Sequence, residues 1–120
     1  MKRGKVFHFN QHNRDQWVAA QARQIEPGSR VLDVGAGEGR YRDCFGHCDY
    51  AAQDFGREPG TMGKYTKLDY ESDITAIPVE DGSFDVILCT EVLEHVPAPI
   101  EAVQEFSRIL RRGGVLLLSA

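Results

Sequence analysis

Residues 84–89, with the sequence Phe-Asp-Val-Ile-Leu-Cys, form a short and nearly continuous apolar run. A strand with one solvated face alternates apolar and polar residues, whereas a strand that is covered on both faces reads as an unbroken apolar stretch. Strands of the second kind belong to parallel sheets that carry helices on both sides. The run therefore predicts an α/β domain in which strands and helices alternate along the chain.

The remaining elements fit that alternation. From apolar spacing and turn residues we expect helices at residues 15–25, 41–45 and 99–110. We expect strands at residues 30–34, 50–55, 67–70, 84–89 and 115–120, and a loop at residues 56–64. Gly113-Gly114 should end the last helix. With right-handed crossovers, these elements give a Rossmann-like, doubly wound and mostly parallel sheet.

Composition narrows the classes of partner. The chain has 120 residues and a net charge of −4. Its basic cluster consists of Arg108, Arg111 and Arg112 and lies at the expected end of a helix, where the helix dipole favours cations. We therefore expect no nucleic-acid partner. No apolar run reaches the roughly 18 residues that span a bilayer, and the N-terminus lacks a signal-peptide pattern. The odd number of cysteines, with Cys89 inside a strand, argues against disulfides. We therefore expect a cytoplasmic protein with no membrane partner.

Ligands of open parallel sheets bind beyond the carboxyl ends of the strands, so the turns there are where chemistry is expected. The first such turn, residues 35–40, reads Gly-Ala-Gly-Glu-Gly-Arg, and its glycines let the backbone approach a ligand closely. A dinucleotide fingerprint needs glycine or alanine at the sixth position, which here is Arg40. Glu38 would also set a carboxylate beside a pyrophosphate. NAD is therefore the less favoured ligand.

The sequence VLDVGAGEGRY at residues 31–41 resembles motif I of the class I S-adenosylmethionine-dependent methyltransferases, where the glycine loop wraps the methionine part of the donor. Asp54 ends the second strand about 20 residues after Asp33, where that family holds both ribose hydroxyls with an acid. Residues 72–85, 89–96 and 108–114 resemble further motifs, the last two those of the ubiquinone- and menaquinone-pathway branch. The resemblance covers residues 30 to 120.

The resemblance implies a donor-binding role for residues in each of these turns. By that similarity, Asp73 accepts a hydrogen bond from the adenine amino group and the Ile74 backbone donates to a ring nitrogen. Phe55 either packs on the adenine face or belongs to the core, and His95 is either a general base or a support for its loop. The expected donor-binding residues are Asp33, Gly35, Ala36, Gly37, Gly39, Asp54, Phe55, Asp73, Ile74, Cys89 and Thr90.

Histidines and cysteines elsewhere carry less weight. The pattern C-x-x-H-C is formed by Cys44, His47 and Cys48, but no second cluster completes a four-ligand shell, so we expect no metal.

The resemblance implies direct methyl displacement from S-adenosyl-L-methionine onto a small-molecule acceptor. This reaction needs alignment of donor and acceptor rather than a nucleophilic residue. Two alternatives stay open, namely a non-catalytic module that binds S-adenosylmethionine and an NAD-binding oxidoreductase domain.

The resemblance also predicts the organisation of the chain. Residues 1–29 form a helical segment whose Phe9, His12, Asn13, Arg14 and Trp17 are candidates for a lid, and residues 30–120 form the donor-binding core. The implied strand order is 3-2-1-4-5, and the family's seven-stranded sheet adds two strands after the fifth. We therefore expect the chain to be a fragment that is incomplete for catalysis, or its fifth strand to be covered in a homodimer or by strand exchange.

Overall fold

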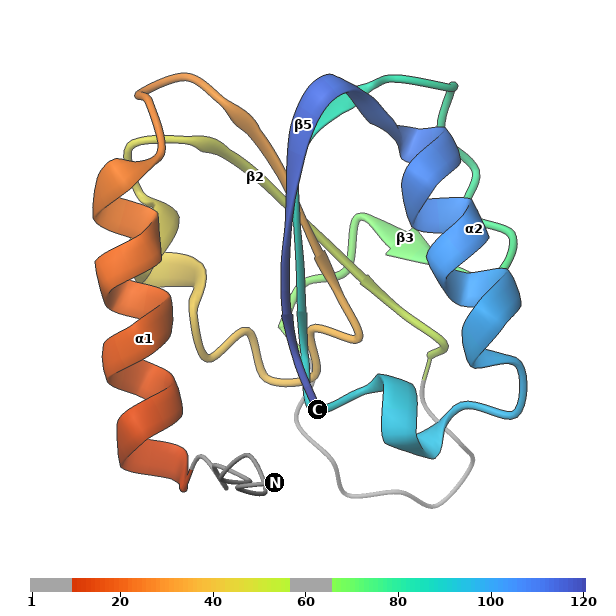
Figure 1. Cartoon of the computed structure of the whole chain (residues 1–120), viewed down its shortest axis with the longest axis horizontal. Helices are drawn as coiled ribbons and strands as arrows, with labels where there is room; N and C mark the ends of the chain where they lie inside the picture. Colours follow the sequence, from red (N-terminus) through yellow and green to blue (C-terminus); the bar gives the residue numbers. More distant parts are fainter. Residues whose placement is uncertain (1–9, 57–65) are drawn as a thin grey trace, which may run out of the picture.

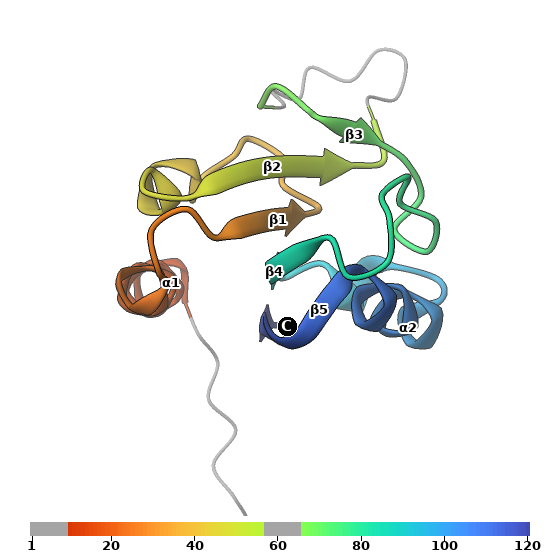
Figure 2. The same cartoon turned by 90° about the horizontal axis from the view of Figure 1, so that it is seen from above.

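The computed structural model describes residues 10–56 and 66–120. Its centre is a parallel sheet of five strands in the order β3-β2-β1-β4-β5. The strands are β1 (Arg30–Val34), β2 (Asp49–Asp54), β3 (Tyr70–Glu71), β4 (Phe84–Thr90) and β5 (Leu110–Ser119). Helix α1 (Gln11–Gln24) lies on one face of the sheet and α2 (Pro99–Ile109) on the other (Figures 1 and 2). The predicted α/β class and strand order are confirmed.

Strand β4 is covered on both faces, as its apolar sequence predicts. Val86 and Leu88 pack in a core cluster with Val18 of α1. Ile87, between them in sequence, packs in a second cluster with Phe106 of α2. The alternate residues of one strand therefore serve two separate cores, and both cores fix β4 beside β1 at the centre of the sheet.

Helix α1 begins at Gln11, which is earlier than the predicted residue 15. Asn10 explains the difference, because its side-chain oxygen accepts a hydrogen bond of 2.8 Å from the Asn13 N–H and so caps the first turn. The helix is polar on most of its surface and buries Val18 and Ala22 against the sheet. In the part of the chain that the structure describes, no helix is long and apolar enough to cross a bilayer.

The boundary between α2 and β5 differs from the prediction. Helix α2 ends at Ile109 and β5 follows at once, so the two glycines lie inside the strand rather than in a loop before it. Gly113 has a φ of 76°, and a Cβ on Gly114 would lie only 3.1 Å from the Asp85 carbonyl oxygen of β4. The glycines thus shape an irregular start of β5, where its register with β4 shifts, and do not terminate α2.

The short helices and the third strand also differ from the prediction. The expected helix at residues 41–45 is a 3-10 helix, η1 (Arg42–Phe45), and a second one, η2 (Leu93–His95), follows β4. The third strand is displaced from residues 67–70 to β3 at Tyr70–Glu71. The predicted loop at residues 56–64 lies outside the described residues except for Gly56.

Candidate functional site

A pocket of about 520 Å³ opens at the carboxyl ends of the central strands, a volume suited to a small ligand. Its walls come from the end of β2 and from the segments that follow β1, β2, β3 and β4. They are Gly35, Gln53, Asp54, Phe55, Ser72, Asp73, Ile74, Val92, His95, Val96 and Pro97. Strand order reverses beside β1, so the pocket lies at the switch point where α/β sheets bind ligands.

The glycine turn after β1 has a left-handed backbone at three positions, with φ values of 66° at Gly35, 52° at Gly37 and 71° at Gly39. A Cβ on Gly35 would lie 2.5 Å from the Val92 side chain, and one on Gly39 would lie 2.7 Å from that of Thr66. A Cβ on Gly37 would meet nothing within 4 Å. The outer glycines therefore permit close packing between segments, whereas the middle glycine borders open space.

Asp54, the last residue of β2, is held by the turns on either side of it. Its Oδ2 accepts a hydrogen bond of 2.9 Å from the Gly37 N–H, and its Oδ1 accepts one of 2.7 Å from the Phe55 N–H. Each carboxylate oxygen can accept a second hydrogen bond. The two backbone donors thus orient the carboxylate in the pocket wall and leave it able to accept from two ligand hydroxyls.

Gln53 is a site residue that the sequence analysis missed. Its side chain is buried, and its Oε1 accepts a hydrogen bond of 3.2 Å from the Gly35 N–H. Its Nε2 donates to the Ser72 carbonyl oxygen at 2.8 Å, so one amide joins the glycine turn to the segment after β3. A large amide next to the acid that ends a buried strand is the signal that could have identified it, because a buried amide requires partners at both ends.

The segment after β3 brings Asp73 and Ile74 to the pocket, as predicted. The Ser72 N–H donates to the Asp54 carbonyl oxygen at 3.0 Å, which fixes the start of this segment. Asp73 Oδ1 accepts hydrogen bonds from the Thr75 hydroxyl at 2.6 Å and the Thr75 N–H at 2.9 Å. These bonds lower the pKa of the Asp73 carboxyl, so the pocket presents a charged carboxylate at this position.

Phe55 and His95 both line the pocket. The Phe55 side chain is 71% exposed, so the alternative that placed it in the core is wrong. His95 is the last residue of η2, and its backbone N–H donates a hydrogen bond of 2.9 Å to the Val92 carbonyl oxygen. This arrangement fits either predicted role for the histidine, general base or support of the loop.

Six of the predicted donor-binding residues are not in the wall of this pocket. They are Asp33, Ala36, Gly37, Gly39, Cys89 and Thr90. Asp33 is buried and accepts a hydrogen bond from the Tyr50 hydroxyl, and its burial raises the pKa of its carboxyl to about 7. Cys89 belongs to the α2-side core, where burial raises the pKa of its thiol to about 12. Both side chains therefore lie behind the turns that form the wall.

The segment after β4 is also connected to α1. Glu91 follows β4 directly and has a φ of 55°, a left-handed conformation that is uncommon for a residue with a Cβ. Its N–H donates to the Ser119 carbonyl oxygen at 2.9 Å, and its carboxylate lies 3.2 Å from the Arg14 guanidinium of α1. The first turn of α1 is thus held beside the end of the central strands.

Two residues of the C-x-x-H-C pattern, His47 and Cys48, contact the turn before β1. His47 Nε2 lies 3.0 Å from the Ile25 carbonyl oxygen, and the Cys48 thiol lies 3.8 Å from that of Glu26. Across residues 10–56 and 66–120, no three histidine, cysteine, aspartate or glutamate side chains are grouped closely enough to hold a metal ion. His8, on the other hand, lies outside the described residues.

The parallel sheet, the glycine turn after β1 and the acid at the end of β2 define a Rossmann-like ligand-binding domain. A family model described as a methyltransferase domain matches residues 32–118, which is most of the chain. The chain belongs to this methyltransferase-domain family, as the resemblance of its motifs predicted.

Relatives of known name agree with that assignment. A ubiquinone biosynthesis O-methyltransferase of Xanthomonas campestris is 35% identical over 108 residues, which cover 82% of this chain and 45% of that protein. A demethylmenaquinone methyltransferase of Renibacterium salmoninarum is 32% identical over 119 residues, covering 95% and 50%. The YcgJ protein of Bacillus subtilis has a similar crystal structure, with a TM-score of 0.70, 24% identity and coverage of 88% and 50%. The chain spans about half the length of the curated relatives that it matches.

Proposed function

We propose that this chain binds S-adenosylmethionine and forms the donor-binding part of a methyltransferase that acts on a small-molecule acceptor. One observation carries the proposal: the glycine turn, the Asp54 carboxylate and the Asp73-Ile74 segment meet at a single pocket. The family match supports the same function, and so do the names of the two quinone-pathway relatives. The family match does not favour an NAD-binding oxidoreductase.

Each wall of the pocket has a proposed part of the donor to hold. Asp54 accepts hydrogen bonds from both ribose hydroxyls, and Asp73 accepts one from the adenine amino group. The Ile74 N–H donates to a ring nitrogen, and the exposed ring of Phe55 packs on the adenine face. The open space beside Gly37 takes the methionine part. Behind the wall, the turn and strand ends are shaped by Asp33, Ala36, Gly39, Cys89 and Thr90.

When bound, S-adenosylmethionine supplies an activated methyl group, so this chain's residues need only align the donor and exclude water. Alignment alone can lower a barrier by roughly 7–11 kcal/mol. His95 lines the pocket, and imidazole is the most common general base, so we propose that it removes the acceptor's proton. The N-terminal segment stays the proposed lid, with His12, Asn13, Arg14 and Trp17 among its described residues, and the ion pair of Arg14 with Glu91 connects it to the end of β4. Phe9, another lid candidate, lies outside the described residues.

The β5 edge of the sheet is the surface where we predict contact with a second copy of the chain. Within the described residues β5 pairs with β4 alone, and its Val115 and Leu118 are partly exposed. Coverage of this edge by a second copy or by strand exchange stays a prediction, which light scattering of the purified protein tests. A monodisperse monomer would contradict the dimer. The cytoplasmic location also stays a prediction.

Calorimetry with S-adenosylhomocysteine, the demethylated product, tests the donor site through Asp54→Ala. The change removes two charge-assisted hydrogen bonds to ribose, and because the loss of even one of them costs about 1.5–3 kcal/mol, affinity should fall at least tenfold. Asp49→Ala is the matched control, because Asp49 lies on the same strand at the opposite, exposed end and should leave affinity unchanged. Folded wild-type protein that binds neither donor nor product would refute the proposal. Transfer of a labelled methyl group to a panel of small acceptors separates the enzyme from a non-catalytic binding module.

A further inference from the structure

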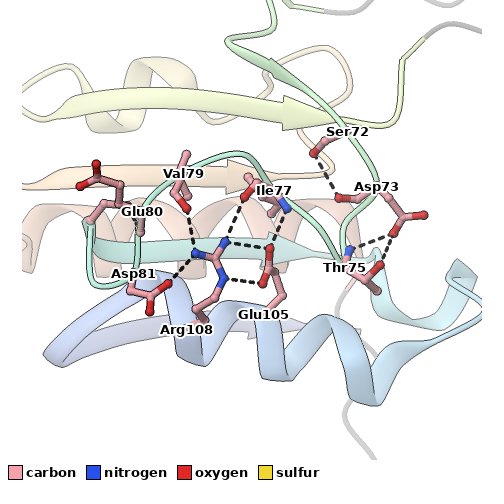
Figure 3. A network of polar contacts seen from close by, with 10 residues as sticks. Ser72, Asp73, Thr75, Ile77, Val79, Glu80, Asp81, Glu105 and Arg108 are labelled. Atoms are coloured by element: carbon pink, nitrogen blue, oxygen red, sulfur yellow. Dashed lines mark hydrogen bonds and ion pairs between the residues drawn. The ribbon is translucent and has the colours of Figure 1, made fainter.

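A glutamate–arginine pair on α2 contacts the segment that joins the pocket to β4. The Arg108 guanidinium binds Glu105 through two parallel hydrogen bonds, Nε to Oε1 at 2.7 Å and Nη2 to Oε2 at 2.9 Å (Figure 3). Only 9% of Glu105 is exposed to solvent. Such two-point pairing fixes the orientation of both side chains, which a single contact does not.

The Glu105–Arg108 pair forms hydrogen bonds with residues 77–81, most of them to the backbone. Glu105 Oε2 accepts a hydrogen bond of 2.7 Å from the Ile77 N–H, and Arg108 Nη2 donates to the Ile77 carbonyl oxygen at 3.0 Å. Arg108 Nη1 also donates to the Val79 carbonyl oxygen and to Asp81 Oδ1, both at 2.8 Å. Because both backbone polar groups of Ile77 are bound, the pair sets the position of the chain at this residue.

The other end of the same segment is fixed at Ser72. The Ser72 N–H donates to the Asp54 carbonyl oxygen and the Ser72 carbonyl oxygen accepts from Gln53, so both backbone polar groups of Ser72 have partners, as those of Ile77 do. Between the two anchors the chain makes a tight turn, in which the Ala76 N–H donates to the Asp73 carbonyl oxygen at 3.1 Å. Figure 3 shows this turn and the Glu105–Arg108 pair along one continuous segment. The pocket residues within it depend on both anchors for their placement.

We propose that the Glu105–Arg108 pair positions the adenine-reading residues Asp73 and Ile74 without touching the donor. This inference rests on the proposed function of the pocket. Neither residue of the pair is in the pocket wall, so any effect on the ligand passes through the backbone of the segment at Ile77. If the pair only stabilised the fold, its loss would lower the affinity for every ligand of the pocket by the same factor. If the pair positions Asp73 and Ile74, its loss changes the preference between ligands that differ in their base.

The test compares S-adenosylhomocysteine with S-inosylhomocysteine, which carries a ring carbonyl in place of the adenine amino group. The wild type should prefer the adenine ligand. In Arg108→Gln the affinity for that ligand should fall about fivefold, the value of one hydrogen bond, while the affinity for the inosine analogue should change little. Arg108→Lys keeps the charge but not the two-point geometry, so it should reduce the preference for the adenine ligand less than Arg108→Gln does. The matched control is Arg111→Gln, which breaks an arginine–carboxylate pair with Asp85 near the start of β4 and should keep the wild-type preference.

Amide hydrogen exchange without ligand adds a readout that is independent of donor binding. Exchange over residues 73–77 should be faster in Arg108→Gln than in the wild type or in Arg111→Gln. An unchanged ligand preference in both Arg108 variants, or a wild type that binds both ligands equally, overturns the inference and leaves donor binding intact. A wild type that binds neither ligand overturns the proposed function and the inference with it.

Discussion

Alanine substitutions at Gly37 and Gly28 separate the backbone cost of replacing a left-handed glycine from a loss of ligand space. Gly37 has a φ of 52° and Gly28, in the turn between α1 and β1, has a φ of 82°. A Cβ at either position would meet no atom within 4 Å. A left-handed backbone costs a residue with a Cβ about 1–2 kcal/mol, and reduced freedom of the unfolded chain offsets about 0.4–1 kcal/mol. Each variant should therefore lose about 1 kcal/mol, or roughly 4 °C in Tm.

Donor binding should distinguish the two variants. At Gly37 the added methyl group enters the space that we assign to the methionine part of the donor, and overpacking of this kind costs about 1–3 kcal/mol. The Kd for S-adenosylhomocysteine, measured by calorimetry, should therefore rise roughly tenfold in Gly37→Ala and stay at the wild-type value in Gly28→Ala. Wild-type affinity in Gly37→Ala would refute the assignment of that space. Weakened binding in both variants would show that lost stability alone accounts for the effect.

Two further predictions concern the polar groups around the glycine turn. Burial raises the pKa of Asp33 to about 7 from an ordinary value of 3.8, so its carboxyl keeps a proton in the folded protein that the unfolded chain has lost. Wild-type stability should therefore fall relative to Asp33→Asn as the pH rises from about 4 to about 7, and a Tm difference that is independent of pH would contradict this. Gln53→Leu leaves the Gly35 N–H and the Ser72 carbonyl oxygen without their partner, so unfolding in urea should show a loss of about 1–3 kcal/mol. A variant as stable as the wild type would mean that water replaces the amide.

The features that sequence could predict are those set by local pattern and by strand direction. The unbroken apolar run at residues 84–89 predicts a strand covered on both faces, and β4 is such a strand. Asp54 and Asp73 were expected in one site because their segments resemble methyltransferase motifs and follow parallel strands whose carboxyl ends share one edge of the sheet, and both line the pocket. Neither expectation needs knowledge of how individual side chains pack.

The features that sequence could not predict depend on which segments become neighbours. Gly113-Gly114 matches the usual end of a helix, but the close approach of Gly114 to Asp85 uses these glycines within β5. Arg108 reads as a cation at a helix terminus, yet its partners include the carbonyl oxygens of Ile77 and Val79 from a segment that crosses beside α2. Such contacts follow from the path of the chain, which local propensity does not encode.

The position of β1 between β2 and β4 has a consequence for synthesis of the chain. Strand β2 follows β1 after a short connection, but β4 begins only at Phe84, so a ribosome releases β1 and the glycine turn long before their second neighbour exists. Parallel pairing between strands so distant in sequence forms slowly, because the intervening loop must close first. The pocket also needs wall residues as late as Pro97. A ligand that binds the folded domain alone cannot stabilise the nascent chain early. It can do so after the wall residues of the pocket, up to Pro97, have emerged from the ribosome.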